Sequence, residues 1–100
     1  MTETVYDIYQ IKNLLTPIFI ANNVRRAMLF GSYGRGDVAP KSDIDLFVDS
    51  GLRGLEFVGL LETITRAVDK NVDLIDATHI ESGSPIEREI ESTGVVLYEI

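Results

Sequence analysis

The sequence predicts a small α/β domain, of the α+β kind, in which helices pack on a small mixed β-sheet. Three observations predict it. Short apolar strands alternate with helical segments, their apolar residues follow the strand and helix periods, and 100 residues suffice for one domain. Strands that alternate with helices are typical of a sheet covered by helices. We therefore expect residues 1–100 to form a single domain.

The first expected element is a helix within residues 5–22. Its apolar residues recur at helical spacing: Ile8, Ile11, Leu15, Ile18 and Phe19. Pro17 complicates this prediction, because a proline inside a helix removes a hydrogen bond and costs about 3 kcal/mol. Thr16 and Pro17 could instead begin a second short helix. We expect helical structure on both sides of Pro17, with or without a kink.

The remaining elements follow in order. Asn22 and Asn23 indicate the end of the first helix. Residues 55–69 carry an amphipathic stripe, and Ser84-Pro85 begins a short helix that ends near Gly94. A polar loop is expected after the glycine-rich segment, through Pro40. Four apolar runs predict strands at residues 24–30, 44–48, 72–75 and 95–98.

Composition narrows the class of protein. Sixteen acidic and nine basic side chains give a net charge of −7, which disfavours a general binder of nucleic acid. The absence of cysteine excludes disulfide scaffolds, zinc–thiolate sites and thiol catalysis. No apolar stretch approaches the length of a membrane span, and the first residues lack the pattern of a signal peptide. We expect a soluble, cytoplasmic protein.

A glycine-rich segment, Gly31-Ser32-Tyr33-Gly34-Arg35-Gly36, directly follows the first expected strand. Glycines allow positive φ and let backbone amides approach an anion. The hydroxyl of Ser32 and the guanidinium of Arg35 are suited to phosphate oxygens. The alternative is a plain turn between a strand and a helix.

Carboxylates mark the second and third of the expected strands. Asp43 and Asp45 are two residues apart on a strand, so they project to one side with α-carbons roughly 6.5–7 Å apart. Asp73 can join them if its strand is the neighbour, whereas Asp76 points the other way and is expected in a loop or cap. Paired carboxylates repel unless a cation lies between them, and Mg²⁺ prefers such ligands. A solvated outer face is the alternative.

The combination resembles the nucleotidyltransferase superfamily of DNA polymerase beta, and more closely its minimal nucleotidyltransferase (MNT) domain. The resemblance is carried by three motifs: Leu29 to Gly36, Ser42-Asp43-Ile44-Asp45-Leu46 and Val72 to Asp76. It covers essentially the whole chain and implies the polymerase beta-like fold. Gly34 departs from it, because many relatives carry alanine there, and this change should loosen the turn without removing a ligand.

The resemblance also implies roles for individual residues. Gly31 and Ser32 would hold the nucleoside triphosphate, with Arg35 and Ser42 as further binding candidates. The metal ligands and catalytic residues would be Asp43, Asp45 and Asp73, and Asp73 would also help to deprotonate the attacking hydroxyl. The implied cofactor is Mg²⁺, with ATP as nucleotide donor.

In the family that this chain resembles, minimal nucleotidyltransferases of this size often act as antitoxins and are encoded beside a HEPN-type ribonuclease toxin. The implied function is transfer of AMP from ATP to a hydroxyl of that toxin, expected to be a tyrosine. The toxin is thus the expected partner in a hetero-oligomeric complex, without direct nucleic-acid or membrane binding. One alternative is an inactive antitoxin that neutralises its partner by occlusion, and another is an enzyme acting on a small molecule or an RNA end.

Overall fold

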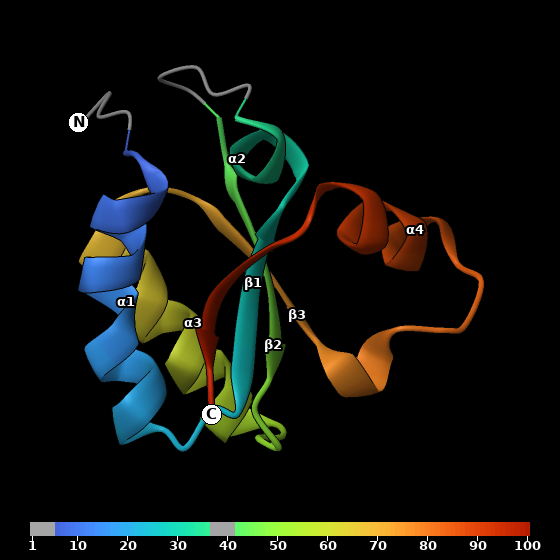
Figure 1. Cartoon of the computed structure of the whole chain (residues 1–100). Helices are drawn as coiled ribbons and strands as arrows, with labels where there is room; N and C mark the ends of the chain where they lie inside the picture. Colours follow the sequence, from blue (N-terminus) through green and yellow to red (C-terminus); the bar gives the residue numbers. More distant parts are fainter. Residues whose placement is uncertain (1–5, 37–41) are drawn as a thin grey trace.

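A four-stranded mixed sheet forms the centre of the computed structural model, which describes residues 6–36 and 42–100. The strands are β1 (Arg26–Phe30), β2 (Ile44–Asp49), β3 (Val72–Asp76) and β4 (Val95–Glu99). They lie side by side in the order β3-β2-β1-β4 (Figure 1). β1 pairs antiparallel with β2 and β4, whereas β2 and β3 are parallel. The predicted mixed sheet is confirmed.

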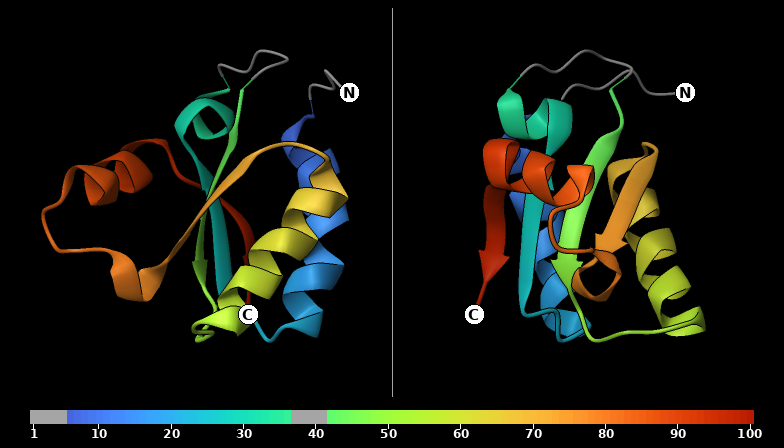
Figure 2. Two further views of the ribbon diagram at one scale, coloured as in Figure 1. Left: turned by 180° about the vertical axis from the view of Figure 1, so that it is seen from behind. Right: turned by 90° about the vertical axis from the view of Figure 1, so that its right-hand side faces the viewer.

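Helices cover the sheet unequally (Figure 2). α1 (Ile8–Ala21) and α3 (Leu55–Val68) pack together on one face, and α3 makes the crossover that parallel β2 and β3 require. The other face carries only α2 (Gly31–Arg35), the 3₁₀ turn η1 (Ala77–His79) and α4 (Pro85–Thr93). This second face, called the open face below, therefore holds less apolar cover and more accessible side chains.

Strand alternation explains which side chains enter the core. In β2, Ile44, Leu46 and Val48 are fully buried, and the residues between them are partly exposed. The buried set faces α1 and α3 and forms one hydrophobic cluster with their apolar stripes. The intervening residues, Asp45 among them, project from the open face. The sequence pattern thus fixes which face carries the carboxylates.

Pro17 does not divide the first helix. α1 runs unbroken from Ile8 to Ala21, and the Thr16 hydroxyl donates to the Lys12 carbonyl instead of capping a new helix. Proline deprives the carbonyl four residues earlier, that of Asn13, of its partner. Because Asn13 is exposed, water can replace this hydrogen bond. The alternative of a second short helix is wrong.

The other elements lie within two residues of their predicted bounds. Asn22 is the C-cap of α1, and Ser84 caps α4 by accepting from the Glu87 amide. The clearest difference is the glycine-rich segment, which forms the short helix α2 where a turn was expected. The polar loop expected through Pro40 lies largely outside the described residues. Within the described part, no helix combines the length and apolar character that a membrane span requires.

Candidate active site

The three predicted motifs meet at one end of the open face. Asp45 lies directly opposite Asp73 in the parallel β2–β3 ladder, and opposite Phe30 in the β1–β2 ladder. Gly31 directly follows Phe30 and begins α2. The predicted neighbourhood of the carboxylate strands is therefore confirmed, and the glycine-rich segment lies beside it.

Asp45 is the most perturbed carboxyl group of this cluster. Its pKa is raised from 3.8 to about 6, first by burial and then by the charge of Asp73 and a hydrogen bond with that side chain. The charges of Glu89 and Asp43 raise the pKa further. These four acids thus concentrate negative charge on one point of the open face. Such an arrangement favours a bound cation.

Gly31 approaches the Asp45 carboxyl group closely. Its φ is +65°, a left-handed conformation that side-chain-bearing residues rarely adopt. A Cβ at this position would overlap Asp45 Oδ2. Glycine is therefore required twice, by the backbone conformation and by the space between the turn and the carboxylate.

The remaining predicted site residues surround this point. Ser32 is partly exposed in the first turn of α2, and Arg35 ends that helix. Ser42 and exposed Asp43 directly precede β2. The Arg35 Nη1 atom lies 3.9 Å from Glu89 Oε2, so this guanidinium faces α4 in the structure. The sequence-predicted residues thus lie at the same end of the sheet.

Two residues of α4 join the site without having been predicted. The Thr93 hydroxyl accepts a hydrogen bond from the Gly31 amide at 3.0 Å and donates to the Glu89 carbonyl at 2.7 Å. Glu89 also contributes charge to Asp45 and pairs with Arg35. The charged residues of this helix alternate in sign along the sequence, a pattern that by itself is typical of an exposed face. No local signal could have identified Thr93, because 62 positions separate it from Gly31.

Gly34 has a packing role that corrects the expectation of a looser turn. A Cβ on Gly34 would overlap the Thr93 carbonyl oxygen. Glycine at this position therefore lets the end of α4 lie directly against α2. Tyr33, beside it, is only 1% exposed and anchors α2 in the core. The glycine tightens the contact between α2 and α4.

The donor atoms of the site fit a hard divalent cation. Within residues 6–36 and 42–100, no three Asp, Glu or His side chains are arranged as a complete metal-binding group. Mg²⁺ does not require one, since it is commonly held by one or two carboxylates together with water and substrate phosphates. Asp45 and Asp73 place carboxylate oxygens at directly opposite ladder positions. Their mutual repulsion is the feature that a cation would relieve.

Comparisons with known proteins identify relatives of this chain. A protein of Methanocaldococcus jannaschii that is named as a protein adenylyltransferase is 35% identical over 71 residues, which cover 69% of this chain and 76% of that protein. A crystal structure of a toxin–antitoxin pair with AMP-PNP superimposes with a TM-score of 0.76 at 25% identity, over 89% of this chain and 73% of the matched chain.

A second solved structure shows the same fold. It is the complex of a tri-AMPylated HEPN toxin of Shewanella oneidensis with its MNT antitoxin, and the TM-score is 0.71 at 22% identity, over 93% of this chain and 73% of that chain. The sequence model of the family described as "Polymerase beta, Nucleotidyltransferase" matches residues 11–100. The chain is therefore a member of the polymerase beta nucleotidyltransferase family.

Proposed function

We propose that this chain is an antitoxin that transfers AMP from ATP to a hydroxyl, expected to be a tyrosine, of a HEPN-type toxin. The observation that carries the proposal is the position of Asp45, directly opposite Asp73 and in contact range of the Gly31 turn. Phosphoryl-type transfer depends on positioning and charge neutralisation more than on a covalent nucleophile. Paired carboxylates beside a glycine turn suit that requirement.

In this proposal α2 and its flanks bind the donor nucleotide. Gly31 and Ser32 hold the triphosphate, and Arg35 and Ser42 contribute further polar contacts. Asp43, Asp45 and Asp73 hold Mg²⁺, which when bound neutralises charge on the triphosphate and the leaving group. Arg35 reaches the phosphates by leaving the exposed and long contact with Glu89, which costs little to break.

The transfer itself exchanges one phosphorus–oxygen bond for another. The acceptor oxygen bonds to the α-phosphorus of ATP, the bond from this phosphorus to the bridging oxygen breaks, and pyrophosphate leaves. Asp73 accepts the proton of the hydroxyl, a role that its exposed position on β3 permits. Neither cysteine nor histidine is needed. With ATP as donor, the reaction belongs in the cytoplasm.

Relatives support the acceptor class. The protein of Methanocaldococcus jannaschii is named for adenylyl transfer to protein, and the toxin–antitoxin pair at 25% identity contains the ATP analogue AMP-PNP. The solved complex from Shewanella oneidensis, which has the same fold, contains an AMPylated HEPN toxin. The net charge of −7 also suits a basic partner such as a ribonuclease.

The test is nucleotide transfer by the wild-type chain and by Asp45→Asn. Each protein is mixed with Mg²⁺, one of four α-labelled nucleoside triphosphates and the product of the neighbouring gene. We expect label on the partner from ATP with the wild type only. Transfer at the wild-type level by Asp45→Asn would contradict the assigned role of Asp45. Absence of label, with tight complexes formed by both versions, would favour inhibition by occlusion.

A further inference from the structure

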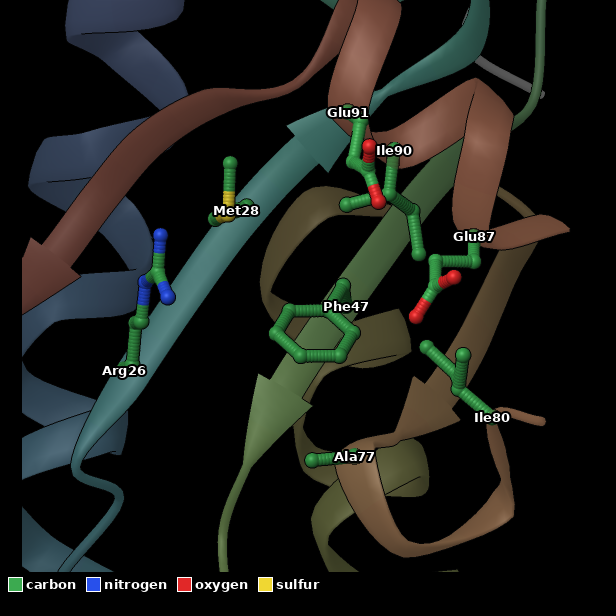
Figure 3. A pocket seen from close by; sticks show the side chains of 8 residues that line it. All are labelled: Arg26, Met28, Phe47, Ala77, Ile80, Glu87, Ile90 and Glu91. Atoms are coloured by element: carbon green, nitrogen blue, oxygen red, sulfur yellow. The ribbon is translucent and has the colours of Figure 1, made fainter. Parts of the chain in front are cut away.

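A pocket of about 490 Å³ lies in the open face, between the strands and the segment from η1 to α4 (Figure 3). Its floor consists of Met28 from β1 and Phe47 from β2, and its walls include Ile80 and Ile90. This apolar surface remains accessible because α4 covers only part of the sheet. The pocket can therefore receive an apolar side chain.

Carboxylates dominate the rim of this pocket. Glu87 and Glu91 project from α4 beside the apolar floor (Figure 3), and neither forms an ion pair within the described part of the chain. Arg26 is the one cation that the described residues place at the rim, and its Nε lies 3.4 Å from a carboxylate oxygen of Glu99. The rim thus retains unneutralised negative charge. An occupant with a positive group beside its apolar part is complementary to it.

The pocket and the candidate active site share their supporting elements. Phe47 follows Asp45 by two positions on β2, so both side chains project from the open face roughly 6.5–7 Å apart along the strand. α4 carries Glu89 at the active site and Glu87 and Glu91 at the pocket. If one side chain of a protein segment is anchored in the pocket, residues a few positions away along that segment therefore reach the catalytic carboxylates.

We propose that this pocket anchors the acceptor protein, through an aliphatic or aromatic side chain flanked by a lysine or arginine. The inference rests on the proposed function, because it identifies the occupant as the protein that receives the nucleotide. Its chemistry follows from the pocket itself: an apolar floor selects the buried side chain, and two carboxylates select the neighbouring cation. Anchoring there brings the acceptor hydroxyl to Asp73.

The rim charge argues against the base of the donor nucleotide as the occupant. A nucleoside triphosphate carries several negative charges, and Glu87 and Glu91 would add repulsion to that of the aspartates. Among the residues that the structure describes, no arginine or lysine other than Arg26 lines the pocket, and Arg26 already faces Glu99. A basic protein segment gains from the same field that a nucleotide would oppose.

The test compares two double charge reversals. Glu87→Lys with Glu91→Lys alters the rim, and Glu56→Lys with Glu62→Lys makes the same change in charge on the exposed side of α3. The dissociation constant for the product of the neighbouring gene is measured by titration calorimetry at low and moderate salt. Binding of a fluorescent ATP analogue with Mg²⁺ is measured separately, without the partner.

We expect the rim reversal to weaken partner binding about tenfold or more at low salt and to leave nucleotide binding intact. The α3 reversal should leave both unchanged. Glu91→Lys alone changes the rim without disturbing the hydrogen bond that Glu87 accepts from the Gly83 amide, and should show part of the effect. Ile80→Ala should weaken partner binding in a salt-independent way, because it removes apolar contact only.

Two results would overturn the proposal. One is unchanged partner affinity in Glu91→Lys, Ile80→Ala and the rim reversal; the other is loss of nucleotide binding with partner affinity retained, which would assign the pocket to the base. Failure of the proposed function is separable from both. If the wild type transfers no label, yet the rim reversal weakens the complex, then the pocket still anchors the partner and the transfer reaction is wrong.

Discussion

The carboxylates on the two faces of β3 lie in opposite electrostatic environments. On the open face, Asp73 lies opposite Asp45, and burial together with the charge of Asp73 raises the pKa of Asp45 to about 6. On the core face, Asp76 is 1% exposed and accepts hydrogen bonds from the amide and hydroxyl of both Ser50 and Thr78. Burial alone would raise the pKa of Asp76, but these hydrogen bonds outweigh it and lower that pKa.

Asp76 thus has the environment of a structural carboxylate, whereas Asp45 has the environment expected of a carboxylate that binds a ligand. The donors around Asp76 satisfy its charge within the fold, so its ionised form stabilises the protein. Asp45 has acidic neighbours instead, and its ionised form costs free energy until a cation arrives. Sites of this kind commonly reduce stability in return for function. The comparison thus predicts opposite consequences when each charge is removed.

Asp76→Asn should have the largest effect on stability. The amide offers one acceptor oxygen in place of two, so donors from Ser50 or Thr78 lose their partner inside the protein. We expect a loss of about 3 kcal/mol in the free energy of unfolding, measured by urea denaturation. Asp49→Asn is the matched control, since its exposed ion pair with Arg25 should contribute less than about 1 kcal/mol. Equal losses in both variants would remove the distinction between the two faces.

Gly31→Ala tests how closely the open face is fitted around Asp45. The added methyl group overlaps Asp45 Oδ2 and strains a φ of +65°, so we expect nucleotide transfer to fall about 100-fold. Gly36→Ala is the control, because its φ of +76° imposes similar strain while no described atom lies within 4 Å of the added carbon. Transfer is measured with labelled ATP at saturating acceptor. If both variants lose activity equally, backbone strain and not the carboxylate contact is responsible.

Thr93→Val tests the link between α4 and the glycine turn. Valine keeps the shape of threonine but cannot accept the hydrogen bond from the Gly31 amide. Without this hydrogen bond the glycine turn shifts, and the shifted turn binds the nucleotide less tightly. We expect about a tenfold loss in kcat/KM for ATP, expressed mainly in KM. Thr93→Ser keeps the hydroxyl and should restore most of this loss. An equal loss in the serine variant would assign the effect to packing against α4.

The sequence predicted the strands and the carboxylates well for a physical reason. Alternation along β2 determines that Ile44 and Leu46 are buried and that Asp45 is not, and this pattern is local. The pairing of Asp45 with Asp73 needed only the assumption that the two strands are neighbours. Their roles as catalytic residues and metal ligands remain predictions, as do those of Gly31, Ser32, Arg35, Asp43 and Ser42.

Tertiary contacts account for what the sequence did not predict. Thr93 and Glu89 reach the site because α4 returns over the open face, and nothing near them in the chain indicates that return. The helical form of α2 depends on the burial of Tyr33 in the core, and the helix propensities of the residues do not predict that burial. The predicted interruption at Pro17 rested on the hydrogen bond that proline removes. The carbonyl that loses this bond belongs to Asn13, which is exposed. Each difference comes from solvent exposure or from distant residues.

Asp45→Asn should make the protein more stable at neutral pH while it abolishes transfer. The pKa of Asp45 is about 6 in the folded chain against an ordinary value of 3.8, so the folded state holds this proton more tightly. That contribution is fully present below pH 3.8 and is lost as the pH rises through about 6. At pH 7 the free energy of unfolding of the variant should exceed that of the wild type by about 1 kcal/mol, a value that allows for solvent screening.

The measurement is thermal and urea unfolding of both proteins between pH 4 and pH 7, without divalent ions. The difference between them should be smallest at pH 4, where Asp45 of the folded chain is neutral, and should grow with pH up to about 6. For Asp76, whose pKa is lowered, the sign is reversed: its contribution is present at neutral pH and is lost on acidification. Added Mg²⁺ should then stabilise the wild type more than Asp45→Asn, because only the wild type retains the uncompensated charge. A variant less stable than the wild type at pH 7 would mean that Asp45 is satisfied within the fold, as Asp76 is.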